Sequence, residues 1–158
     1  MPNLRIEPMQ PDEAGAIVAL IRGNYDKNVA RYNSDDGNKI FYDYLNIDDL
    51  IARNQHDHFT LIAKDDDTIA GVIEVRNNNH ISLFFVHDDM RRQGIGKKLF
   101  EAAKNRIIQI GETKKITANS SPNSTAVYRK LGFTALSKEK VHNGLRYVPM
   151  SIDLTTKP

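Results

Sequence analysis

The segment before the middle helix of the chain combines residue types that can bind an anion. Residues 88–96 read DDMRRQGIG and lead into a helical pattern, with glycine at Gly94 and Gly96 and lysine at Lys97 and Lys98. The first N–H groups of a helix lack internal partners and carry partial positive charge. Glycine lets a bulky anion approach them. The pattern therefore predicts a phosphate site, and the alternative is a plain strand-to-helix turn with solvated cations.

Two well-known phosphate loops do not fit this segment. A Walker A loop, G-x-x-x-x-G-K-[ST], would need glycine at Arg91 and Ser or Thr at Lys98. The dinucleotide fingerprint, G-x-G-x-x-G, would need glycine at Leu99 and a first strand just before it, whereas three predicted strands precede this loop. The sequence excludes both ligand-binding loops.

A second motif follows further along the chain. Residues 91–96, R-x-x-G-x-G, resemble the acetyl-coenzyme A loop of the GNAT superfamily of N-acetyltransferases. Residues 128–133, YRKLGF, resemble the Y-x-K-L-G-F signature that closes the next βα unit of that family. The glycine loop alone is a weak signal. The two motifs in this order, together with the order of predicted elements, make the resemblance specific.

These motifs need strands and helices that hold them together. Length and pattern predict one domain over residues 1–158, of mixed α/β (α+β) class and similar to the GNAT fold. We expect a central, mostly antiparallel twisted sheet of about seven strands, with about four helices. The predicted order is strand 4–9, a helix from Pro11, helix 39–53, strands 58–65, 68–76 and 80–87, helix 94–110, strand 114–120, a helix from Ser121-Pro122 to Leu131, and two strands within 133–154, with Pro149 bending the last or placing it at an edge.

The resemblance implies where acetyl-CoA would bind. Its pyrophosphate would lie on the glycine loop, and its pantetheine arm would run along the preceding strand, since its two amides can pair with a strand backbone. Asn123 is either a ligand of the arm or a polar residue at the start of a helix. The residues implied in cofactor binding are Phe84, Phe85, Val86, Arg91, Arg92, Gln93, Gly94, Ile95, Gly96, Lys97, Asn119 and Asn123.

The resemblance also implies a catalytic tyrosine. Tyr128 matches the family tyrosine near the thioester sulfur, and a phenol there can protonate the leaving thiolate. The alternative is a core tyrosine that packs its helix on the sheet. The oxyanion needs a donor as well, and the N–H of Val86 or of its neighbour matches the strand-backbone donor of the family.

The attacking amine must lose a proton, which calls for a base or a water relay. Glu74 lies among apolar residues of the strand paired with 80–87, where burial can raise the pKa of a carboxylate. Strand alternation allows the opposite reading, in which Glu74 faces solvent. His87, Asp88 and Asp89 are further candidates, although acids before a helix commonly serve as caps.

Charge is unevenly distributed. Residues 1–89 hold 16 Asp/Glu and 8 Lys/Arg, and residues 90–158 hold 4 and 14, so the halves carry −8 and +10. The asymmetry is typical of two partners of opposite sign or of two solvated faces. The resemblance implies that the early helices shape the acceptor site, and the first reading of the charge then favours a cationic amine there. Its lining would come from Tyr25, Tyr32, Tyr42 and Tyr44, with Asp35, Asp36, Asp43, Asp48 or Asp49 attracting the cation; the alternative is that the tyrosines face the core.

Together these patterns predict an N-acetyltransferase that transfers an acetyl group from acetyl-CoA directly to a primary amine of a small molecule or peptide. The chain has no cysteine that could carry the acyl group. The rival readings are an acetyl-CoA sensor without turnover and a nucleic-acid binder. The cationic segment 91–115 holds 8 Lys/Arg but only Phe100 for stacking, which argues against nucleic acid.

The remaining expectations concern location and partners. No apolar run approaches the roughly 18 residues of a membrane helix, and no leader pattern opens the chain, which predicts a cytoplasmic protein without a membrane partner. His56 and His58 make a poor metal pair, so we expect no metal. A free edge on the last strand would allow a homodimer.

Overall fold

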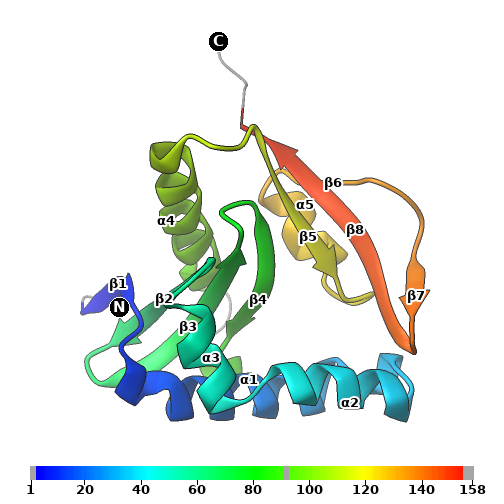
Figure 1. Ribbon diagram of the computed structural model, residues 1–158, viewed down its shortest axis with the longest axis horizontal. Helices are drawn as coiled ribbons and strands as arrows, with labels where there is room; N and C mark the ends of the chain where they lie inside the picture. Colours follow the sequence, from blue (N-terminus) through cyan, green and yellow to red (C-terminus); the bar gives the residue numbers. More distant parts are fainter. Residues whose placement is uncertain (1–2, 91–92, 155–158) are drawn as a thin grey trace.

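The computed structural model of the chain describes residues 3–90 and 93–154, and at its centre lies an open sheet of eight strands (Figure 1). The strand order is β1-β2-β3-β4-β5-β8-β6, and β7 pairs with β8 beside this path. All neighbouring strands are antiparallel except β4 and β5. The strands are β1 (Leu4–Pro8), β2 (His58–Asp65), β3 (Thr68–Arg76), β4 (His80–Val86), β5 (Lys115–Ser120), β6 (Thr134–Ala135), β7 (Lys140–His142) and β8 (Leu145–Asp153).

Helices cover both faces of the sheet and confirm the predicted mixed α/β class. Helix α4 packs on the face that holds Leu61 and Ile73, and α1 packs on the face that holds Ile62 and Leu83. Figure 1 shows α1 and α2 crossing below the strands. The helices are α1 (Ala14–Asn28), α2 (Asp35–Tyr44), α3 (Ile47–Arg53), α4 (Ile95–Ile110) and α5 (Thr125–Lys130), with 3-10 turns η1 (Pro11–Glu13), η2 (Ala30–Tyr32) and η3 (Asp88–Met90).

The predicted helix 39–53 was wrong in its bounds, since the segment forms two helices. The Ser34 hydroxyl accepts a hydrogen bond from Gly37 N at 3.1 Å and starts α2 earlier than expected. The Asn46 side chain accepts from Asp49 N at 2.9 Å and starts α3. Each oxygen satisfies a helix N–H that would otherwise lack a partner. The apolar stripe continues across both helices, and periodicity alone therefore merged them.

The end of the chain also differs from the expectation. The segment after Phe133 forms two short strands, β6 and β7, rather than one. Strand β8 is not at an edge, because β5 pairs with one side of it and β6 with the other. Pro149 is tolerated because its carbonyl accepts from Leu136 N at 2.8 Å on the β6 side, so the missing N–H removes no bond to β5. The free edge on which the predicted homodimer rested is therefore partly covered.

The sheet splits where β4 and β5 part. These two strands pair only at His80 with Thr117 and at Ile81 with Ala118. A β-bulge follows at once: Ile81 lies opposite Val75 and Leu83 opposite Glu74, so Ser82 is the extra residue. Figure 1 shows β4 turning away from β5 and β8 beyond this point. No helix of the described residues is long and apolar enough to cross a membrane.

Candidate active site

A cleft of about 710 Å³ opens where β4 and β5 separate. Its walls come from the end of α1 and the segment up to α2, from β4, from the start of α4, from β5 and α5, and from β8 with the turn before it. Segments far apart in the sequence thus share one cavity. The predicted site residues that line it are Phe84, Phe85, Val86, Gly94, Ile95, Gly96, Asn119, Asn123 and Tyr128.

The start of α4 forms one end of the cleft. Gly94 precedes the helix with φ 78°, a left-handed conformation that glycine adopts readily, and its carbonyl accepts from Lys98 N at 3.0 Å. A Cβ on Gly96 would lie 3.6 Å from the Phe84 ring and 3.7 Å from Val86, which are ordinary contacts. Packing within the protein therefore does not require glycine at position 96. The absent side chain instead leaves open space beside the helix N–H groups.

The other predicted cofactor-binding residues flank this helix start. Gln93 and Lys97 are exposed on either side of it. Arg91 and Arg92 lie outside the described residues. The cations predicted to assist phosphate binding thus include one described lysine at the mouth of the helix.

The end of β4 directs backbone groups into the cleft. His87 N donates to Ala70 O at 2.7 Å, which makes these two residues a hydrogen-bonded pair. In the same register Val86 lies opposite Gly71, and Phe84 lies opposite Ile73. Because hydrogen-bonded and non-hydrogen-bonded pairs alternate along antiparallel strands, the N–H and C=O groups of Phe84 and Val86 face away from β3. The Val86 carbonyl accordingly accepts from the Asn24 amide at 2.8 Å. The gap between β4 and β5 is therefore lined by backbone polar groups that a bound chain could use.

Tyr128 is packed in the core and also lines the cleft, and its catalytic role stays a prediction. It is only 8% exposed, and its ring meets Phe84 edge-on at 6.0 Å and Phe133 at 5.3 Å between centroids. It also lines the cleft. Burial raises the pKa of its hydroxyl far above the usual value, so the phenol keeps its proton at neutral pH. A packed, protonated phenol at the cleft is what a proton donor to a thiolate requires.

Asn119 and Asn123 both line the cleft, in different settings. Asn119 is exposed on β5. Asn123 donates from its amide to Asn28 O at 2.9 Å, which ties the loop before α5 to the end of α1. Helix α5 begins at Thr125 rather than at Ser121-Pro122, because that segment forms a turn ahead of the helix, so Asn123 is not its first residue.

Glu74 is buried, and the solvent-facing alternative for it was wrong. Its side chain is 0% exposed and accepts from Tyr44 Oη at 2.6 Å, Ser82 Oγ at 2.7 Å and Arg53 Nε at 2.9 Å. Burial, together with the charge of Glu74, raises the pKa of Tyr44 to about 12, so Tyr44 stays a donor. Glu74 does not line the cleft, whereas Ser82 does. The bulge in β4 thus connects a buried carboxylate to the cavity through one hydroxyl.

Sequence reasoning missed Ser82 and Arg53 and assigned Tyr44 to the acceptor site instead of to Glu74, and no local signal marks these contacts. Ser82 is one small residue in an apolar strand, and its place at the bulge depends on pairing with β3. Arg53 lies 21 residues from Glu74 in sequence and Tyr44 lies 30 residues away. Only the packing of α2 and α3 on the sheet brings these groups together.

The polar residues after β4 hold the loop rather than face an acceptor. Asp88 pairs with Lys27 at 3.2 Å and accepts from the Asn28 amide at 3.2 Å. Asp89 N donates to His87 Nδ1 at 3.2 Å. None of these three candidate bases, His87, Asp88 or Asp89, is among the described residues that line the cleft.

The far end of the cleft is closed by contacts between α1, α2 and the β7–β8 turn. The Asn33 side chain accepts from Arg146 N at 2.8 Å and donates to Tyr25 Oη at 2.9 Å, and Tyr25 donates to Asn38 at 2.7 Å. Gly37 lies so close to the turn that a Cβ would meet the Gly144 carbonyl at 2.4 Å. This end of the cleft is therefore held together by contacts between segments that lie far apart in the sequence.

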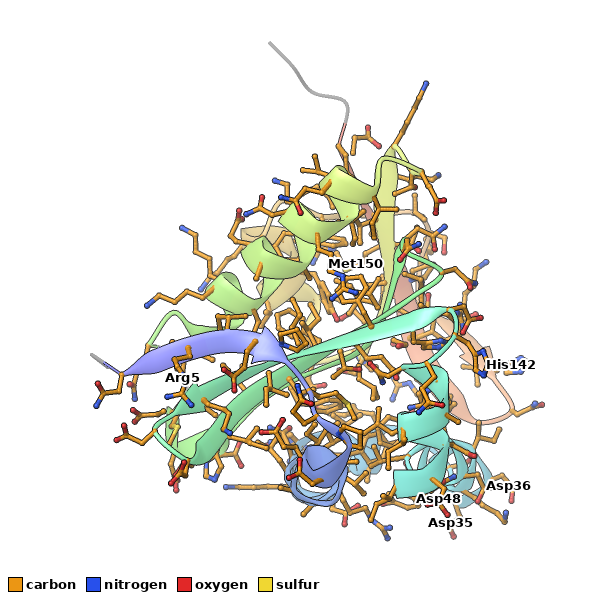
Figure 2. All side chains as sticks on the ribbon, turned by 60° about the vertical axis from the view of Figure 1, so that its left-hand side comes forward. Arg5, Asp35, Asp36, Asp48, His142 and Met150 are labelled. Atoms are coloured by element: carbon orange, nitrogen blue, oxygen red, sulfur yellow. The ribbon has the colours of Figure 1, made fainter. Side chains whose placement is uncertain are left out.

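The predicted acidic lining of that end was wrong. Of the four tyrosines only Tyr25 lines the cleft; Tyr44 binds Glu74, Tyr42 binds Asp26, and the Tyr32 carbonyl accepts from Arg146. The aspartates sit on the outer sides of α2 and α3, where their exposed carboxylates stay hydrated. Figure 2 shows three of them pointing away from the sheet. The five exposed aspartates are Asp35, Asp36, Asp43, Asp48 and Asp49.

Comparison with known proteins agrees with this geometry. Residues 29–154 match the family described as an acetyltransferase (GNAT) domain. Comparison with curated proteins finds no match. Among the described residues, no group of three or more His, Asp or Glu side chains is placed to hold a metal ion.

Solved structures of similar fold have low sequence identity. A GCN5-related N-acetyltransferase from Rhodopseudomonas palustris is 20% identical, with a TM-score of 0.81 and 95% of each chain covered. A PaiA N-acetyltransferase from Thermoplasma acidophilum in complex with coenzyme A is 17% identical, with a TM-score of 0.80 and coverage of 95% of this chain and 98% of the other. An aminoglycoside 6'-N-acetyltransferase complexed with coenzyme A is 13% identical, with a TM-score of 0.73 and coverage of 98% and 99%.

The family match extends over most of the chain, and the fold of the solved neighbours is the fold described above. The cleft of this chain lies between the strands β4 and β5, where they diverge, and the start of α4, which carries the glycines of the first sequence motif. The chain belongs to the GNAT family of acetyltransferases and is an enzyme of the acyltransferase class.

Proposed function

We propose that the protein transfers an acetyl group from acetyl-CoA to a primary amine by direct attack. One observation carries the proposal: a continuous cleft runs from the glycines at the start of α4, past outward-facing backbone of β4, to Tyr128. A phosphate site, a channel for an amide-bearing arm and a proton donor thus follow one another. Acetyl-CoA presents its pyrophosphate, pantetheine arm and thioester in this order.

The residues present fit acetyl-CoA. The first N–H groups of α4 can bind the pyrophosphate, and Gly96 leaves beside them the space that a Cβ would fill. The outward-facing backbone groups of Phe84 and the N–H of Val86 can pair with the amides of the arm, as a neighbouring strand would. Asn119 lies across the gap on β5.

Bound acetyl-CoA supplies a thioester carbonyl that an amine can attack. The N–H of Phe84 or of Val86 is directed into the gap and can donate to the oxygen as it gains negative charge. As the new C–N bond forms and the C–S bond breaks, Tyr128 gives its proton to the leaving sulfur. The chain contains no cysteine for an acyl intermediate, so attack is direct.

The amine must also lose a proton, and we propose that Glu74 takes it through Ser82. Ser82 lines the cleft and its hydroxyl donates to Glu74 at 2.7 Å, so the lone pairs of that hydroxyl can accept a proton from the amine or from a water next to it. A shift along this chain moves one proton to the carboxylate. Arg53 Nε donates to the other carboxylate oxygen at 2.9 Å and holds the carboxylate in place for this transfer.

A matched pair of variants tests this relay. Ser82→Ala should lower kcat by about 100-fold, the lower end of the usual contribution of general acid–base catalysis. Tyr44→Phe removes a hydroxyl that donates to the same oxygen of Glu74 but does not line the cleft, and should leave kcat within about threefold. Equal losses in both variants would show that the hydroxyls only position Glu74 and would remove Ser82 from the relay.

The function is tested by binding first and turnover second. Saturating acetyl-CoA, at about 100 times its Kd, should stabilise the fold by roughly 2.7 kcal/mol, while NAD and ATP serve as controls. Release of free thiol is then measured with a panel of amines, without background from this cysteine-free chain. Stabilisation without thiol release for any amine would favour an acetyl-CoA sensor. The expected cytoplasmic location and homodimer stay predictions.

A further inference from the structure

The acceptor end of the cleft is cationic rather than acidic, and this observation bears on the substrate. Among the described residues that line the cleft there is no Asp or Glu, whereas Lys130, His142 and Arg146 line it. From this lining, we propose that the acceptor is a small amine that also bears an anionic group, as a free amino acid does. The inference rests on the proposed acetyl transfer and names its substrate class.

The acids nearest the cleft are committed to other partners. Glu74 is buried against Arg53, and Glu139 binds the Arg146 guanidinium at 2.6 and 3.0 Å. Asp88 pairs with Lys27 and Asn28. The aspartates of α2 and α3 lie on the outer surface (Figure 2). An additional ammonium group in the cleft would therefore find amides and hydroxyls, but no negatively charged side chain among the described residues that line the cleft.

This arrangement disfavours a polycation. Each extra ammonium of a polyamine or aminoglycoside would lose hydration in the cleft, and near Arg146 it would meet a like charge, while no Asp or Glu is among the described residues that line the cleft. An amine with one anionic group meets the opposite situation. The guanidinium of Arg146 is a planar donor suited to a carboxylate or a phosphate, and His142 lies on the same turn.

Hydrogen bonds fix the backbone of Arg146, whereas its side chain remains partly exposed. Its backbone N–H donates to Asn33 at 2.8 Å, and Ser34 N donates to Gly144 O at 3.1 Å, so the β7–β8 turn is fastened to the start of α2. The side chains of Arg146 and Glu139 are 41% and 35% exposed. An exposed ion pair contributes little net stability, so a ligand anion can share or replace Glu139.

The position of Arg146 separates it from the cofactor phosphates. Figure 1 shows the β7–β8 turn above α2, on the other side of the gap from α4. The phosphates of acetyl-CoA are expected at the start of α4. A cation at the β7–β8 turn is therefore available to the acceptor.

Matched acceptors test the substrate class. Thiol release is measured with a mixture of free α-amino acids, the same mixture as C-terminal amides, O-phosphoethanolamine and spermidine. We expect kcat/KM for the free acids or for O-phosphoethanolamine to exceed that for the amides and spermidine by at least about tenfold. The comparison of the free acids with O-phosphoethanolamine distinguishes a carboxylate from a phosphate. Equal or better turnover of the amides or of spermidine would overturn the inference.

A variant assigns the effect to Arg146. Arg146→Gln should raise the KM for the preferred anionic acceptor about tenfold and remove its advantage over the neutral analogue, while kcat and the Kd of acetyl-CoA stay close to wild type. Arg146→Lys should keep part of the preference. Arg129→Gln, at an exposed position of α5 that does not line the cleft, is the matched control. A KM unchanged in Arg146→Gln would exclude this arginine as the anion-binding group.

The outcomes also separate this inference from the proposed function. Acetyl-CoA stabilisation with acetylation of spermidine or amides would leave the acetyl transfer intact and refute only the acceptor class. Absence of both stabilisation and turnover would refute the acetyl-CoA site itself. Stabilisation without turnover of any acceptor would refute the transfer and, with it, the acceptor class.

Discussion

The two ends of the cleft are built in different ways. At the α4 end, residues close in sequence supply the site: Gly94 and Gly96 flank Ile95, and the last residues of β4 precede them by a few positions. At the β7–β8 end, the walls meet through side chains from distant segments, such as Asn33 with Arg146, 113 residues apart. A site for a cofactor can thus be a local motif, whereas the acceptor site is a product of packing.

The largest expected effect comes from removing the proposed proton donor at the cofactor end. Tyr128→Phe should lower kcat by about 100-fold or more, because the leaving thiolate loses its proton donor. Since burial raises the pKa of Tyr128, the wild-type rate should not fall as pH rises toward 10, where an exposed tyrosine ionises. Steady-state kinetics from pH 6 to 9.5 measure both. A kcat within twofold of wild type would leave Tyr128 with a packing role only.

The next effect separates binding from stability. Gly96→Ala adds a Cβ that makes only ordinary contacts with Phe84 and Val86, so folding should be unimpaired or slightly improved. The same Cβ occupies the proposed pyrophosphate space, and the Kd of acetyl-CoA should rise by about tenfold or more. Titration calorimetry and thermal melting measure the two effects.

A matched glycine serves as its control. Gly23 lies in α1, and a Cβ there would have no neighbour within 4 Å. Gly23→Ala should stabilise the helix by about 0.5–1 kcal/mol and leave the Kd of acetyl-CoA unchanged. Unchanged binding in Gly96→Ala as well would mean that the glycine loop is a plain turn.

A smaller effect concerns the acceptor end. Asn33→Ala removes bonds to Arg146 N and Tyr25, and should raise the acceptor KM by about fivefold and lower the free energy of unfolding by about 1–2 kcal/mol. The Kd of acetyl-CoA should stay the same. Asn54→Ala is the control, since the Asn54 amide donates to Leu50 O at 2.9 Å, away from the cleft, and its loss should cost stability without raising KM. A weaker acetyl-CoA Kd in Asn33→Ala would contradict the separation of the two ends.

The smallest expected effect concerns the place where β4 still pairs with β5, at His80 and Thr117. His80 Nδ1 pairs with Thr117 Oγ1 at 2.8 Å across β4 and β5, and burial lowers the pKa of His80 to about 4 from its usual 6.5. The folded state favours the neutral ring, so stability is present above about pH 6.5 and is lost as pH falls toward 4. Because the ring is partly exposed, we expect a loss of about 1 kcal/mol.

Urea unfolding at pH 7.5 and 4.5 measures this loss. His80→Gln should reduce the difference in the free energy of unfolding between the two pH values, and His56→Gln, at an exposed position, should not. An identical acid loss in wild type and His80→Gln would assign the pH dependence to other groups.

The sequence predicted most of the fold because its signals were local. Glycine closed α5, with φ 107° at Gly132, and the strands of the meander followed their apolar runs. The failures were of another kind. Helix 39–53 divided at Asn46, and β8 stayed inside the sheet despite Pro149, because a cap and a neighbouring strand settled these points. The hydrophobic periodicity of the sequence carries no information about the Asn46 cap or about the pairing of β6 with β8.

The candidate site divides along the same line. The sequence by itself determined the elements of the proposed cofactor end, since helix N–H groups, glycines and a strand end act through the backbone and need only be adjacent in the chain. Tertiary structure alone decided that Glu74 is buried, that Ser82 connects it to the cleft, and that the aspartates of α2 and α3 face solvent. Burial and pairing depend on which distant segments pack together. The charge that an acceptor meets is therefore a property of the fold.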